Sequence, residues 1–157
     1  MLTLSEVQQI EYREYADMFN AYMEYLCCEV EPIELNCFEW GLFYQYFHNK
    51  GIRHYLIRDN STVYGFVSIG VGKEAKPVGC DYYIVDTYIK PEYQRKGIGE
   101  WMVKDIRKRY RGTVFLYIKR GNKRAKSFWG KMFADCEDVR GKFDYLENEW
   151  CEVRGWR

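Results

Sequence analysis

The chain has 157 residues, of which 47% are hydrophobic and 18% aromatic, so it can bury the core of one domain and is not a disordered chain. No apolar run approaches the roughly 20 residues of a membrane-spanning helix, and the start, MLTLSEVQQ, does not resemble a signal peptide. The net charge of +1 hides an asymmetry: residues 1–49 carry nine acids and one base, whereas residues 90–131 carry fourteen bases and three acids. This pattern indicates an anionic ligand for the middle of the chain and a cationic one for its first part, or else solvated helix faces.

The cysteines give no sign of a metal or redox site. They are Cys27, Cys28, Cys37, Cys80, Cys136 and Cys151. No two of them form a CxxC pair, so we predict no bound metal. Because no export signal precedes them, we expect reduced thiols and a cytoplasmic protein without a membrane segment.

The first fifty residues are predicted to form two helices, with a short strand before them at residues 2–4. Ser5, with Gln8 three residues later, is typical of a capping box. The apolar stripe of the first helix consists of Tyr15, Phe19, Tyr22 and Leu26. The second helix is predicted to start at Asn36, with a stripe formed by Phe38, Leu42 and Tyr46.

The rest of the chain alternates strands and helices. Strands are predicted at 54–59, 62–70, 81–89 and 112–118, and two more between 136 and 154 that turn near Gly141. One helix has the stripe Ile98, Met102, Ile106 and Tyr110, and another has Ala125, Phe128, Trp129, Met132 and Phe133. This order predicts a single α+β domain with a mixed sheet.

The segment PEYQRKGIGEWM, residues 91–102, connects a predicted strand to a predicted helix. Its two glycines let the backbone approach a ligand, and the helix start offers unpaired N–H groups and the positive end of the dipole. Arg95 and Lys96 add charge, so the segment has the properties of a phosphate-binding loop. It matches neither a Walker A loop nor a dinucleotide fingerprint, because GxxxxGK[ST] and GxGxxG are both absent.

Two motifs together resemble the GNAT (Gcn5-related N-acetyltransferase) superfamily. The first, Gln94-Arg95-Lys96-Gly97-Ile98-Gly99, is similar to the family's Q/R-x-x-G-x-G/A, and the second, Asn122-x-x-Ala125-x-x-Phe128-Trp129, resembles N-x-x-A-x-x-F-Y. The resemblance covers roughly residues 53–140 and implies a mostly antiparallel sheet flanked by helices, with a splayed central strand pair. It divides the single domain, 1–157, into a helical acceptor-side region (1–50), an acetyl-CoA-binding core (53–134) and C-terminal strands (136–154).

The resemblance implies that acetyl-CoA is the cofactor and assigns residues to it. The pantetheine arm would bond to the backbones of Thr87, Tyr88 and Ile89. The pyrophosphate would rest on the segment Gln94, Arg95, Lys96, Gly97, Ile98, Gly99 and Glu100. The second motif contributes Asn122, which would contact the cofactor or brace the loop, and Ala125, Phe128 and Trp129. Candidates for the 3′-phosphate are Lys123, Arg124 and Lys126.

The implied reaction is direct attack of an amine on the thioester, which needs a group to take the amine proton. Asp86 is the candidate, although strict strand alternation would turn it away from the face that Thr87 shares with Tyr83, unless a bulge re-aims it. The alternative is a structural strand acid. Relatives place a glutamate at the positions aligned with Tyr83 or Tyr117, and both tyrosines can hold a water.

The position of the family's usual thiol-protonating tyrosine is occupied by Trp129, whose indole cannot supply a proton near neutral pH. Tyr117 and Tyr145 are alternatives. The sequence therefore predicts an N-acetyltransferase acting on a small-molecule or protein amine, with a non-catalytic acyl-CoA sensor as the second interpretation. A nucleic-acid-binding module ranks last, because aromatic residues do not interleave the cations of the basic helix. GNAT proteins are often dimers, so a homodimer is one expectation.

Two further groups of residues have open interpretations. The histidines, His48 and His54, lie outside both motifs and are expected to have surface or strand-packing roles. The aromatic side chains of the first two helices exceed what one core needs. We expect some of them to line an acceptor pocket and, with nearby acids such as Glu24, to favour a cationic amine; a crowded core or a dimer contact is the alternative.

Overall fold

The computed structural model describes residues 1–27, 39–73, 80–119, 121–138 and 149–156. Its elements in chain order are β1 (Thr3–Glu6), η1 (Gln9–Glu11), α1 (Tyr12–Tyr25), α2 (Trp40–Phe47), β2 (Ile52–Arg58), β3 (Val63–Val71), β4 (Tyr82–Ile89), η4 (Pro91–Tyr93), α3 (Ile98–Arg109), β5 (Gly112–Lys119), α4 (Lys123–Met132), β6 (Glu137–Asp138) and β7 (Glu149–Trp156). Apart from the two short 3-10 helices, this order is the one predicted from the sequence. The turn predicted near Gly141 lies outside the described residues.

The strands within the described ranges form one sheet in the order β1-β2-β3-β4-β5-β7-β6. Every neighbouring pair is antiparallel except β4 and β5, which run parallel. A parallel pair requires a crossover connection. Here α3 provides it, together with the loop of residues 94–97 that precedes it, which we call the glycine loop. The predicted α+β class with a mixed, mostly antiparallel sheet is confirmed.

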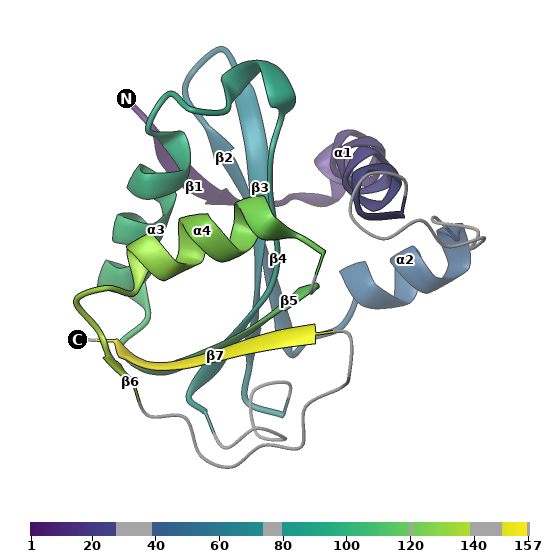
Figure 1. The fold of residues 1–157 in the computed structure, drawn as a ribbon. Coiled ribbons are helices and arrows are strands. Elements are labelled where there is room, and N and C mark those ends of the chain that lie inside the picture. The colour runs from purple at the N-terminus through teal and green to yellow at the C-terminus, as the bar shows by residue number, and fades with distance from the viewer. Residues whose placement is uncertain (28–38, 74–79, 120, 139–148, 157) are drawn as a thin grey trace.

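Helices cover both faces of the sheet, with α3 and α4 on one side and α1 and α2 on the other (Figure 1). The alternation of β3 shows how one strand serves both layers. Phe66 belongs to the core under α1 and α2, whereas its neighbour Val67 belongs to the core under α3 and α4. Met102 and Ile106, predicted for the apolar stripe of α3, are both buried in the second core.

The predicted capping box at Ser5 is wrong. Ser5 lies inside β1, where it pairs with Leu56 of β2, because pairing with β2 gives the backbone of this segment hydrogen-bond partners in an extended conformation. The box lies three residues further on, where the Gln8 N–H donates to the Glu11 carboxylate at 2.9 Å. The polar residues that can cap are therefore present, but the helical turn starts later.

The stripe predicted for the second helix is right at Tyr46, which packs against the core under α1 and α2, and wrong at Leu42. The helix begins at Trp40, and its buried residue is Phe43, at 3% exposure, whereas the predicted core residue Leu42 is 60% exposed. The other residues used for that prediction, Asn36 and Phe38, lie outside the described residues. No helix in the described part of the chain is long and apolar enough to cross a membrane.

Candidate active site

A cleft opens in the sheet where the two parallel strands separate. β4 and β5 pair over three residues each and stop at Ile84 and Leu116, although both strands continue. The cleft beyond this point has a volume of about 1720 Å³ and is lined by α1, β4, the glycine loop, α3, β5 and α4. Pockets for small ligands usually measure roughly 300–1000 Å³. This cleft therefore has room for a long cofactor and a second substrate.

The glycine loop at this cleft has the backbone geometry of an anion site. Arg95 and Gly97 have positive φ angles, 62° and 80°, which turn the chain sharply into α3. The first N–H groups of any α-helix lack an intrahelical partner, and α3, which starts at Ile98, has no side-chain cap to bind them. A Cβ at Gly99 would lie 3.2 Å from the Phe128 ring, so only glycine fits here without displacing that ring. These features suit a phosphate group at the positive end of the helix dipole.

Gln94 ties the glycine loop to two other elements. Its amide nitrogen donates to the Ile89 carbonyl at the end of β4, at 2.8 Å, and its amide oxygen accepts from Arg124 of α4 at 2.9 Å. The loop, the splayed strand and α4 are thereby held together around one opening.

Several cations surround the cleft. Those that line it are Arg95, Lys119, Lys123, Arg124 and Lys131. Of the three residues predicted for a 3′-phosphate, Lys126 is not in the lining. Lys96 is not in the lining either; its ammonium lies over the ring of Tyr93, 5.5 Å from the ring centroid. Lys131 went unpredicted, because it belongs to neither motif and only its place on α4 brings it to the rim.

The second motif caps α4 and packs it. Asn122 is the N-cap residue, with its side-chain oxygen accepting from the Ala125 N–H at 3.0 Å and from the Tyr25 hydroxyl at 3.4 Å. Ala125 and Phe128 line the cleft. Trp129 also reaches it, but is only 4% exposed and stacks on Phe133 at a centroid distance of 5.4 Å.

A β-bulge sets the direction of Asp86. Ser68 pairs with Asp86 whereas Ile69 pairs with Ile84, so Val85 is an extra residue on β4. With strict alternation Asp86 would share the face of Ile84, in the core under α3 and α4. The bulge turns it to the opposite face, where the Tyr46 hydroxyl of α2 donates to its carboxylate at 2.8 Å.

The bulge also changes the predicted relation between Thr87 and Tyr83. Thr87 pairs with Val67, a residue of the core under α3 and α4, and therefore lies on that face. Tyr83 lies on the opposite face, because its neighbours Tyr82 and Ile84 both belong to the same core as Val67. The prediction that Thr87 and Tyr83 share a face of the sheet is therefore wrong. The other possibility given by the sequence, a bulge that changes the direction of Asp86, is what the structure has.

Burial dominates the electrostatics of Asp86. It raises the pKa of the carboxyl, while hydrogen bonds from Tyr46 and Tyr22 act in the opposite direction. Burial, together with the nearby negative charge, raises the pKa of both tyrosines well above its usual value. The tyrosines therefore remain protonated and donate to the carboxylate. Neither was predicted to contact Asp86, because only the bulge brings Asp86 to them.

Tyr83 and Tyr117 also lie in the cleft. Their rings meet edge to face with centroids 6.3 Å apart, and Tyr117 is 37% exposed. Tyr145, the other predicted proton donor, lies outside the described residues.

Both interpretations of the N-terminal aromatic side chains hold in part. Tyr22 and Tyr25 of α1 line the cleft together with Glu24, whereas Tyr15 and Phe43 are buried in the core. The histidines take packing and surface roles: His54 is 5% exposed inside that core and His48 is exposed. The part of the cleft that α1 lines is thus aromatic and acidic.

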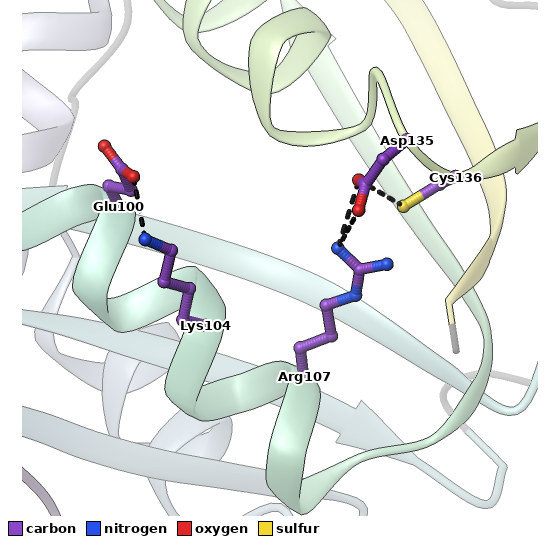
Figure 2. A network of polar contacts seen from close by, with 5 residues as sticks. All are labelled: Glu100, Lys104, Arg107, Asp135 and Cys136. Atoms are coloured by element: carbon purple, nitrogen blue, oxygen red, sulfur yellow. Dashed lines mark hydrogen bonds and ion pairs between the residues drawn. The ribbon is translucent and has the colours of Figure 1, made fainter.

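Basic residues of α3 form ion pairs. Lys104 pairs with Glu100 at 2.9 Å and Arg107 with Asp135 at 3.0 Å (Figure 2). Arg109 pairs with Asp105 at 2.8 Å, so three cations of this helix already have acidic partners. In the described part of the chain, no group of three His, Cys, Asp or Glu side chains is arranged to hold a metal ion.

A family model named Acetyltransferase (GNAT) family matches residues 10–134, most of the chain and all of the cleft. The protein belongs to the GNAT acetyltransferase family. Its members' cosubstrate, acetyl-CoA, is therefore the one to consider for the cleft. No curated protein sequence matched this chain.

Solved structures of GNAT proteins share this fold. An acetyltransferase from Thermus thermophilus superposes with a TM-score of 0.72 at 15% identity, covering 98% of this chain and 96% of the other. A spermidine N-acetyltransferase from Vibrio cholerae, solved with CoA and spermine, gives 0.62 at 16% identity, covering 98% and 92%. The PaiA N-acetyltransferase from Thermoplasma acidophilum, in complex with coenzyme A, gives 0.65 at 13%, covering 100% and 99%. At these identities the likeness establishes the fold.

Proposed function

We propose that this protein is an acetyl-CoA-dependent N-acetyltransferase that acts on a primary amine of a cationic acceptor by direct attack. One observation carries the proposal: a single cleft joins a helix start that suits an anion to a partly buried carboxylate held by a tyrosine of α2. The first feature suits the cofactor phosphates and the second suits an ammonium group.

The residues present fit the cofactor. The backbone of Thr87 to Ile89 forms no ladder pair with β5, so its groups other than the Ile89 carbonyl, which Gln94 binds, can bond to the pantetheine amides. The N–H groups from Arg95 to Glu100 would hold the pyrophosphate, and Glu100 would be tolerated there because its carboxylate is paired with Lys104. Lys123 and Arg124 lie at the rim for the 3′-phosphate. When bound, acetyl-CoA supplies an activated acetyl thioester.

The acceptor end favours a positively charged amine. Asp86 offers a partly buried negative charge, and Tyr22, Tyr25 and Tyr83 offer rings on which an ammonium group can rest. Glu24 adds a second carboxylate at the same end, which suits an acceptor with more than one positive charge. The structural neighbour that binds spermine supports testing polyamines first.

Asp86 is proposed to take the proton of the bound ammonium group, so that the free amine can attack the acetyl carbonyl. A carboxyl whose pKa is raised by burial is better matched to this task than an exposed one. The carbonyl oxygen would be polarised by a backbone N–H near Ile89. Tyr117, which lies in the cleft, is the candidate donor of a proton to the departing thiolate.

One observation favours the second candidate function, an acyl-CoA-binding sensor. Trp129 stands where the family's tyrosine stands, and it is buried against Phe133, so it supplies no proton. A sensor would keep the cofactor cleft and release no thiol.

The experiment that tests the proposal is Asp86→Asn, assayed with spermidine, spermine and simple alkyl diamines. The acetyl-transfer rate should fall by about tenfold or more, in line with the usual contribution of a general base, while acetyl-CoA affinity measured by calorimetry stays unchanged. An unaltered rate and pH–rate profile would remove Asp86 as the base.

A further inference from the structure

A buried cluster of polar side chains lies behind Asp86, on the face covered by α1 and α2. Tyr15 and Ser68 are fully buried and His54 is 5% exposed. The Tyr15 hydroxyl lies 2.9 Å from His54 Nδ1 and 2.8 Å from Ser68 Oγ, and Ser68 Oγ lies 3.0 Å from the same Nδ1. None of the three is among the residues that line the cleft. Placing three polar groups in an aromatic core costs free energy unless every group is hydrogen-bonded, so their arrangement calls for a role.

The hydrogen bonds of His54 fix its tautomer. Its Nε2 lies 3.2 Å from the backbone carbonyl of Tyr46, and because a carbonyl only accepts, Nε2 carries the proton. Burial lowers the pKa of His54 to about 4, so the ring is neutral and Nδ1 is left as an acceptor. His54 therefore accepts from Tyr15 or Ser68 at one nitrogen and holds the last turn of α2 with the other.

Tyr46 connects this cluster to the cleft. Its hydroxyl donates to Asp86 at 2.8 Å. Burial raises the pKa of this hydroxyl, and the nearby Ser68 side chain acts to lower it. Its ring packs against His54 and Phe19 with centroids 4.8 and 5.2 Å away. The backbone, ring and hydroxyl of Tyr46 are thus all held, and the hydroxyl points at the carboxylate.

We propose that Tyr46 is a positioning residue that holds the Asp86 carboxylate at the acceptor end of the cleft, and that His54, Ser68 and Tyr15 hold Tyr46. The expected effect on kcat rests on the proposed function, whereas the expected effect on the titration of the Asp86 carboxyl does not. Among the described residues, the other titratable or charged groups that face Asp86 or line the cleft from α1, β4 and β5 are Tyr22, Glu24, Tyr25, Tyr83, Tyr88, Tyr117 and Lys119.

The test is Tyr46→Phe, which removes one hydroxyl and keeps the ring. The matched control is Tyr44→Phe, an exposed position on the same helix. We expect the titration midpoint of the Asp86 carboxyl, followed by carbon NMR, to rise by about one pH unit in Tyr46→Phe and not in the control, because a carboxylate loses a hydrogen bond to its charged form. The pH at which kcat falls to half on the acidic side should rise by the same amount, while KM for acetyl-CoA stays unchanged.

The outcomes separate this inference from the proposed function. A carboxyl midpoint that moves in Tyr46→Phe supports the positioning role even if Asp86→Asn leaves turnover intact, in which case the catalytic proposal alone fails. An unmoved midpoint in a folded Tyr46→Phe protein overturns the positioning role. If Tyr46→Phe does not fold, Ser68→Ala replaces it, with the same direction expected and a smaller shift; an unmoved midpoint there also overturns the inference.

Discussion

Asp86 shows how one extra residue decides what a side chain can do. The sequence identifies two acids near β4, and the structure separates their roles. Asp81 accepts hydrogen bonds from the backbone and hydroxyl of Thr113, at 2.6 and 2.9 Å, and so joins β4 to β5. Asp86 instead faces the cleft, because the bulge at Val85 reverses the alternation. Asp86 could be chosen from the sequence because the reaction needs a carboxylate. No local pattern in YYIVDTYI predicts the bulge, because the bulge depends on pairing with β3.

The burial of Asp86 should be measurable as a stability cost. Because its folded-state pKa is raised above 3.8, the folded protein holds a proton that the unfolded chain releases, and stability falls as pH rises through that window. The Asp86→Asn variant has no carboxyl to ionise at this position, so its stability does not fall in that way. We expect its Tm at neutral pH to exceed that of the wild type by roughly 2–4 °C, the effect of about 1 kcal/mol in a domain of this size, and the difference to vanish at acidic pH.

Asp81→Asn is the matched control for that experiment. Hydrogen bonds from Thr113 lower the pKa of Asp81, so its contribution to stability is present above the usual pKa and is lost as pH falls. Its replacement should therefore lower the Tm at neutral pH. A Tm of Asp86→Asn below the wild-type value at neutral pH would contradict the account of its burial.

Among the elements, the glycine loop and α3 were the most predictable from the sequence, and the N-terminal segment the least. Gly97 with Gly99, followed by a stripe with helical spacing, identifies a turn and a helix from local residues. The start of α1 depends instead on whether Ser5 pairs with β2, a contact about fifty residues away in the chain. Local signals fail where a distant strand competes for the same backbone groups.

The loop geometry predicts the effect of a single methyl group. Gly97→Ala places a side chain at φ 80°, which costs roughly 1–2 kcal/mol unless the loop rearranges. We expect acetyl-CoA affinity, measured by calorimetry, to fall about fivefold or more, because the N–H groups at the start of α3 no longer point at one site.

Gly130→Ala is the control for the loop variant. Gly130 is exposed on α4, and a Cβ there meets no atom within 4 Å. This change should leave affinity unaltered and stabilise the helix by up to about 1 kcal/mol. Equal affinity of Gly97→Ala and the wild type would show that the loop does not hold the cofactor.

For the whole molecule, the uneven charge of the sequence corresponds to the two ends of one cleft. Cations from the middle of the chain line the side of the glycine loop and α4, and the acidic first helix brings Glu24 to the other end. The separation of positive and negative charge could be anticipated from the composition of the two parts of the chain, and the fold class from the order of predicted strands and helices. The contacts between α1, α2 and the carboxylate could not, since they depend on how two aromatic helices pack on the sheet.

If this cleft transfers an acetyl group to an amine, adding the amine must release free CoA from acetyl-CoA. We expect at least one cationic primary amine, from a panel of polyamines, diamines and peptide amines, to release free CoA well above the rate with water alone. Asp86→Asn should lower that rate about tenfold or more. A protein that binds acetyl-CoA and releases no thiol with any amine of the panel would contradict the account and favour an acyl-CoA sensor.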